Sequence, residues 1–79
     1  PNPTMGELVA DFLVYRKLKD LKVQIMDARG VFIFEKELNP RMGTQRVELD
    51  LSEQSSGVYF LTFTDESETF RHQVKVSKY

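Results

Sequence analysis

Few residues of this chain could do chemistry. Its 79 residues include a single histidine, His72, and no cysteine, which excludes thiolate nucleophiles, disulfides and thiolate metal sites. A catalytic triad could be assembled on paper from Ser55, His72 and Asp65, but nothing in their spacing favours it. Because His72 falls on the apolar side of an alternating segment, we expect it at the edge of the core, without a role as ligand or catalytic base.

Two acidic pairs, Glu35/Glu37 and Glu48/Asp50, are the other candidates for chemistry. Acid–base hydrolysis needs two carboxylates held across one substrate site. The members of each pair are two residues apart, the spacing of one face of a strand, so we expect these faces to be solvated. The sequence also contains no glycine-rich phosphate loop. It therefore predicts no enzyme, no metal site and no cofactor.

Length and charge narrow the class of protein further. A chain of 79 residues forms one small domain. Its 11 basic and 12 acidic residues nearly cancel, which argues against a nucleic-acid partner held by phosphate contacts. No apolar run is long enough to cross a bilayer, and we expect no membrane insertion.

The elements that position the side chains are predicted to be strands. Four segments alternate apolar and polar residues with a period of two: Leu8, Ala10, Phe12 and Val14 in 7–14, Leu21, Val23 and Ile25 in 21–26, Val47, Leu49 and Leu51 in 46–51, and Phe70, His72, Val74 and Val76 in 70–76. A helix over residues 9–21 is the alternative to a first strand. The β-branched and aromatic content of that segment and its missing cap favour the strand.

Two further segments, 31–38 and 57–64, are apolar on both faces, as central or covered strands are. If Ile33 and Leu61 face the core, then Phe32, Phe34 and Phe60 form a partly exposed aromatic patch. The alternative is that these rings pack under a neighbouring loop.

Turn residues separate the predicted strands. Asp27 to Gly30 predicts a tight hairpin in which Asp27 bonds its own backbone and Gly30 takes a positive φ. A longer loop follows at 39–43, a polar crossing at 52–57 and a final hairpin at 65–67. About six strands with turns at this spacing predict an all-β antiparallel sandwich.

Four segments, in this order, resemble a known family: PNPTMGEL, KVQIMDARGVFIF, ELDLSEQSSGVYFLTF and HQVKVSKY. Together they are similar to the type A C-terminal sorting domain of the type IX secretion system, found in Bacteroidota, and they cover essentially the whole chain. The residues that carry the family motif are Pro1, Asn2, Pro3, Asp27, Gly30, Ser56, Gly57, Val58, Tyr59 and Phe60.

The resemblance implies an immunoglobulin-like sandwich of about six to seven strands and a function in secretion. Such a domain directs a cargo protein from the periplasm across the outer membrane, to the cell surface or the medium. The implied partners are an outer-membrane translocon, a shuttle protein and a sortase-like protease. That protease commonly removes the domain and transfers the cargo to a surface lipopolysaccharide.

The first residues of the chain differ from the family pattern. Family domains often have a strand that runs into Pro-Asn-Pro, whereas this sequence begins at Pro1 without an initiator methionine or a signal peptide. We therefore expect residues 1–79 to be the sorting domain of a longer protein, without the first family strand. An open strand edge would then favour a homodimer.

The last segment, HQVKVSKY, is predicted to be a strand and also the secretion signal. The signal residues are Val74, Lys75, Val76, Ser77, Lys78 and Tyr79. Arg71 and Lys75 share an outward face, which would suit an acidic docking groove or strand addition. The simpler interpretation is that this strand only completes a sheet.

A second function remains open at this stage. An immunoglobulin-like adhesion or carbohydrate-binding module could use exposed rings of the patch, Phe32, Phe34 and Phe60, to stack on sugar. Glycan binding would distinguish this module from a sorting domain.

Overall fold

Six strands make up the described part of the chain. The computed structural model describes residues 6–79, so Pro1, Asn2 and Pro3 of the family motif lie outside the described residues. The strands are β1 Glu7–Val14, β2 Lys22–Asp27, β3 Phe32–Glu37, β4 Gly43–Asp50, β5 Gly57–Thr64 and β6 Arg71–Lys78. Residues 6–79 contain no helix, and the predicted all-β class is confirmed.

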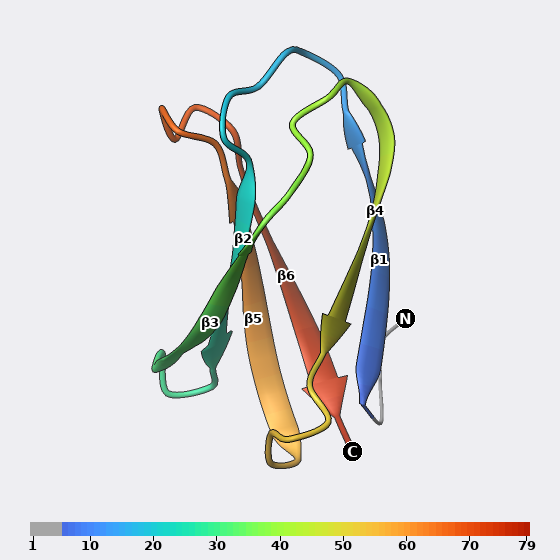
Figure 1. Ribbon diagram of the computed structural model, residues 1–79. Coiled ribbons are helices and arrows are strands. Elements are labelled where there is room, and N and C mark those ends of the chain that lie inside the picture. Colours follow the sequence, from blue (N-terminus) through green and yellow to red (C-terminus); the bar gives the residue numbers. More distant parts are fainter. Residues whose placement is uncertain (1–5) are drawn as a thin grey trace.

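The strands form two antiparallel sheets that face each other (Figure 1). One sheet has two strands, β1 and β4, and the other has four in the order β3-β2-β5-β6. The chain crosses between the layers three times, after β1, after β3 and after β4. This arrangement is consistent with an immunoglobulin-like sandwich.

The core lies between the sheets and follows the predicted alternation. The fully buried side chains include Val23, Ile25, Leu51, Leu61 and Phe63. The rings of Phe12 and Phe63 are 5.2 Å apart between centroids and join the two layers. Alternation fixes which face of each strand is apolar, and burying those faces against each other holds the sheets together.

The segment considered for a helix is a strand followed by a loop. β1 ends at Val14, and residues 15–21 form an irregular crossing. Leu18 and Leu21 of this crossing are buried with Val14 in a second, smaller cluster. The crossing is thus held by its own apolar anchors, and the extended interpretation of 9–14 is confirmed.

β3 departs from simple alternation because it carries a β-bulge. Phe32 pairs with Met26 and Phe34 with Ile25, so Ile33 is an extra residue in the ladder. A bulge of this kind turns two successive side chains toward one face, and both Ile33 and Phe34 pack against the core. Of the predicted patch of Phe32, Phe34 and Phe60, Phe34 is therefore half-buried and turned toward the core. Phe32 is 53% exposed and Phe60 is half-buried.

The hairpin between β2 and β3 has the predicted turn chemistry. Asp27 Oδ1 accepts hydrogen bonds from the backbone N–H groups of Arg29 (2.9 Å) and Val31 (3.0 Å). The Gly30 N–H donates to the Asp27 carbonyl at 3.0 Å, and Gly30 has a φ of +85°. Only glycine takes this conformation without strain, so the hairpin is set by these two residues.

Candidate functional site

The three residues of the hypothetical triad are not brought together. Ser55 lies before β5 and Asp65 directly after it, so a strand of eight residues separates them, a length of about 27 Å. Asp65 instead accepts hydrogen bonds from the Ser67 and Thr69 hydroxyls and the Phe70 N–H. These hydrogen bonds lower the pKa of the Asp65 carboxyl, and the bond from Phe70 contributes most. Asp65 therefore acts as a hydrogen-bond acceptor within the β5–β6 loop.

His72 differs from the prediction in one respect. It pairs with Phe63 in the β5–β6 ladder, and the two rings are 6.3 Å apart between centroids. The imidazole is exposed, however, and does not form part of the core. The reason is that β6 is an edge strand, so a residue near its start has a covering neighbour on one side only.

The acidic pairs lie on solvated faces, as predicted. Glu35 and Glu37 are exposed on the four-stranded sheet, and Glu48 and Asp50 on the two-stranded one. Asp50 accepts a hydrogen bond from the Ser52 N–H at 2.9 Å, and bonding to Ser52 lowers the pKa of its carboxyl. Within residues 6–79 no three His, Asp or Glu side chains cluster as metal ligands would, and no helix is suited to cross a membrane.

β6 carries the predicted secretion signal. Among the six described strands it is hydrogen-bonded to β5 alone, at the end of the order β3-β2-β5-β6. Val76 is 1% exposed and anchors the strand, Lys75 points outward and is exposed, and Tyr79 beyond the strand is 68% exposed. Lys78 is only 9% exposed, because it has the same inward phase as Val74 and Val76. The signal residues thus divide into a buried set and an accessible set.

A shallow apolar groove runs between β6 and β1. It has a volume of about 220 Å³, and its lining residues come from β1, β5 and β6: Leu8, Val9, Ala10, Asp11, Leu61, Phe63, Val74 and Val76. Each of the flanking strands has a hydrogen-bonded neighbour on one side only among the described residues. The core residues that line the groove, among them Leu61 and Val76, are themselves almost fully buried.

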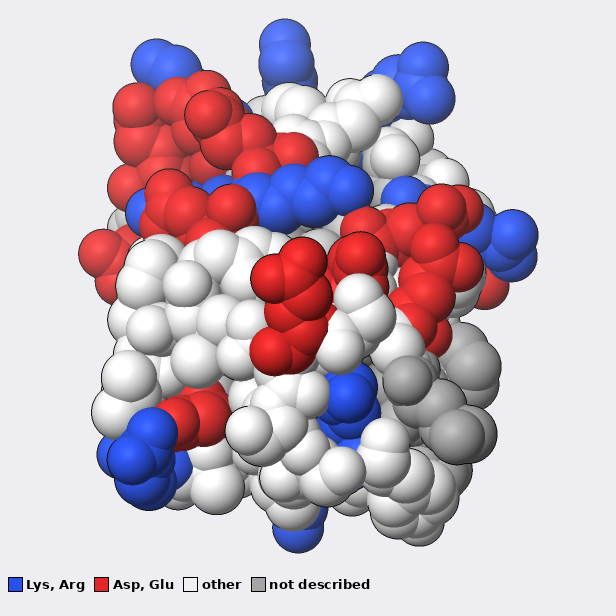
Figure 2. Space-filling view, turned by 60° about the horizontal axis from the view of Figure 1, so that its bottom comes forward, with Lys and Arg blue, Asp and Glu red and all other residues white. Residues whose placement is uncertain are grey.

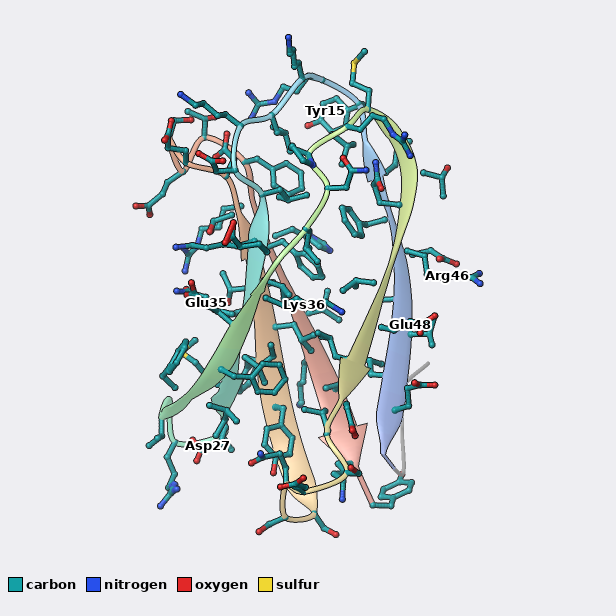
Figure 3. All side chains as sticks on the ribbon, in the orientation of Figure 1. Tyr15, Asp27, Glu35, Lys36, Arg46 and Glu48 are labelled. Atoms are coloured by element: carbon teal, nitrogen blue, oxygen red, sulfur yellow. The ribbon has the colours of Figure 1, made fainter. Side chains whose placement is uncertain are left out.

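The opposite seam, between β3 and β4, is bridged. Lys36 Nζ donates a hydrogen bond of 3.0 Å to the backbone carbonyl of Glu48, so one side chain ties an edge of one sheet to an edge of the other. Figure 3 shows Lys36 extending from β3 toward β4 and Glu48. The crossing from β3 to β4 also lies on this side (Figure 1). Among residues 6–79 the sandwich is thus bridged along β3/β4, whereas an apolar groove lies along β1/β6.

Charge on the outer face of the four-stranded sheet is mixed. Arg71 of β6 lines a depression of about 450 Å³ together with carboxylates from other segments, among them Glu37 and Glu68. Figure 2 shows acidic side chains gathered in separate groups with basic side chains between and beside them. The positive charge predicted for the outward face of β6 is therefore partly offset near Arg71 by these carboxylates. Lys75 is the outward cation nearest to the C-terminal end of the strand.

The sequence matches the family described as secretion system C-terminal sorting domain over residues 1–77. The chain belongs to this family. No curated protein and no solved structure shows a significant match to it. The sorting domain is the C-terminal signal for type IX secretion. It engages the secretion machinery and directs export across the outer membrane, to the cell surface or the medium.

The described motif residues of this sorting domain have structural roles. Asp27 and Gly30 form the β2–β3 turn. The other motif residues, Ser56 to Phe60, begin β5, where Gly57 has a φ of +149° and Tyr59 donates its hydroxyl hydrogen to the Ser55 carbonyl. The family is a sorting signal and not a catalytic domain. The exposed ring of Phe32 alone, without Phe34, gives no support to the carbohydrate-binding alternative.

Lys36 is the residue that sequence analysis missed. With Ile33 facing the core, simple alternation places Lys36 on the outward face together with Phe34, and the bulge at Ile33 turns it inward. A bulge between two apolar residues leaves no clear mark in a sequence. The run of four apolar residues from Val31 to Phe34 was the only available sign.

Proposed function

We propose that the secretion machinery recognises the outward face and the exposed end of β6. The observation that carries the proposal is that β6 is anchored by a buried valine, Val76, while Lys75 and Tyr79 are exposed. A partner can therefore dock on this part of the strand without unfolding the domain. The groove beside β1 offers it further apolar contacts.

The finer steps of the pathway also belong to this proposal. The cargo crosses the periplasm, a shuttle protein and an outer-membrane translocon bind the domain, and a sortase-like protease removes it. The domain itself catalyses nothing and needs no cofactor. We further propose that two copies of the domain can form a homodimer.

The test is export of a cargo protein that carries the domain. Removing Val76 to Tyr79 would be ambiguous, because Val76 and Lys78 are buried and their loss would unfold the sheet. Deletion of Tyr79 and the substitution Lys75→Glu change only exposed positions. A matched control is Lys22→Glu, which reverses the same charge on the same sheet face but on the interior strand β2.

We expect the Tyr79 deletion and Lys75→Glu to leave a folded cargo in the periplasm, and Lys22→Glu to be exported normally. Surface fractionation measures the location, and the unfolding transition of each purified domain measures folding. Normal export of both β6 variants would contradict the proposal, and equal loss for Lys22→Glu would point to overall charge as the cause.

A further inference from the structure

One end of the sandwich combines exposed apolar side chains with unpaired cations. The ladder between β1 and β4 finishes with the pairs Leu13–Thr44 and Val14–Gly43. Tyr15 and Met42 each lie one residue beyond the last pair, so they meet at the same end of the two-stranded sheet. Leu13 is 59%, Tyr15 74% and Met42 59% exposed. Figure 3 shows Tyr15 at this upper end, where β1 finishes.

Three cations accompany these side chains. Arg16, Lys17 and Arg41 are exposed, and among the described residues none of them takes part in an ion pair. In contrast, Lys19, Arg29 and Arg46 are each paired with a carboxylate. We name the six residues the basic tip: Leu13, Tyr15, Arg16, Lys17, Arg41 and Met42.

A hollow adjoins the basic tip on the β1/β6 side. It has a volume of about 440 Å³, and Tyr15 and Arg16 line it together with Arg71 and His72 of β6. Its one carboxylate, that of Asp11, is neutralised by Arg46 at 2.9 Å. The hollow therefore extends the positive character of the tip and offers donors to a phosphate group.

We propose that the basic tip docks on an anionic lipid surface. Cations next to exposed aromatic and apolar side chains are the chemistry that binds anionic headgroups and the interface beneath them, and tyrosine in particular favours the membrane–water boundary. A sorting domain that directs export across the outer membrane must approach a membrane. The basic tip then lies at the level of the lipid headgroups and does not cross the bilayer.

The remaining charges of this end set the orientation. Asp20, Glu66 and Glu68 lie over the four-stranded sheet around a separate depression, and Lys19 pairs with Glu66 at 3.4 Å. An anionic surface repels this half and attracts the half above β1 and β4. The domain therefore docks tilted, with the two-stranded sheet nearest the lipid.

The experiment is co-sedimentation of the 79-residue domain with vesicles. One set contains phosphatidylcholine alone, and the other contains phosphatidylcholine with phosphatidylglycerol. We expect binding to the second set only, weakened by salt. Each tip cation removed should lower the partition coefficient about fivefold, so Lys17→Gln is compared with Lys75→Gln, which removes one exposed lysine from β6.

The apolar part is tested in the same way. Tyr15→Ser should weaken binding, whereas Phe32→Ser, which removes an exposed ring from the opposite end, should not. Free inorganic phosphate competes with the vesicles if the hollow alone accounts for binding. Absence of binding to anionic vesicles, complete displacement by phosphate, or equal loss in tip and control variants would overturn the proposal. So would binding of the tip to a protein of the machinery without any vesicle binding.

Discussion

At the scale of single residues, the β2–β3 turn shows how two side chains set a hairpin. Asp27 satisfies two backbone N–H groups, and Gly30 supplies a φ of +85°. These roles could be predicted from the sequence because turn chemistry is local and depends on residue type. Phe34 and Lys36 could not be assigned correctly, because their directions depend on a bulge that is set by pairing with β2.

Gly30→Val should destabilise the domain. A Cβ at this position meets no heavy atom within 4 Å, so the cost is conformational and amounts to about 1–2 kcal/mol of unfolding free energy. Gly30→Asn is the control, since asparagine tolerates a positive φ better than valine. Urea unfolding should show a lower midpoint for valine with an unchanged slope, and equal midpoints for the two variants would contradict the turn assignment.

Acid should destabilise the domain through carboxylates bonded in the folded state. Hydrogen bonds lower the pKa of the Asp27 and Asp65 carboxyls. The largest contribution comes from the Arg29 side chain for Asp27 and from the Phe70 N–H for Asp65. A lowered folded-state pKa means that this stabilisation is complete above the unfolded value of about 3.9 and is lost as pH falls through the folded-state pKa. The melting temperature should therefore decrease as the pH is lowered below about 4. Asp65→Asn should melt lower than the native domain at neutral pH and lose less on acidification, and parallel pH curves would contradict this.

At the scale of elements, the two seams of the sandwich differ in how their strand edges are protected. β3 has three features that hinder pairing with another strand, namely a bulge, charged side chains and an inward-directed lysine. β1 carries the apolar residues Val9 and Leu13 on its outward face. The element boundaries could be predicted from alternation, whereas the difference between the seams depends on which strands become neighbours across the layers.

Lys36→Leu should favour association of the domain through β3. The substitution removes the bond to the Glu48 carbonyl and the inward charge, so the edge becomes a better template for another strand. Lys22→Leu adds the same leucine to β2, whose two edges are already paired. Light scattering at rising concentration should increase for Lys36→Leu and stay near the native value for Lys22→Leu, and the opposite order would contradict the protective role.

At the scale of the whole molecule, residues 6–79 form a small sandwich with one bridged seam and a groove along the other. Its inner face could be assigned from the sequence wherever alternation is strict, as at Val23, Leu49 and Leu61. The burial of Lys78 was not expected, because a lysine near the end of a segment is normally exposed to solvent. Its position in the alternation nevertheless matches that of the buried Val76. The groove between β1 and β6 is likewise a property of the assembled layers and of no single segment.

The apolar side chains on the outward face of β1 predict self-association. Two copies can pack Val9 and Leu13 against each other about a twofold axis, which would join the β4–β1 sheets of both copies. Sedimentation equilibrium should show a mass that rises with concentration. Val9→Lys places a charge on the outward face of β1, beside the groove, and should shift the equilibrium to monomer. Val58→Lys makes the same change on the interior strand β5 and should not. A native domain that stays monomeric at high concentration, or a dimer that both lysine variants weaken equally, would contradict pairing through β1.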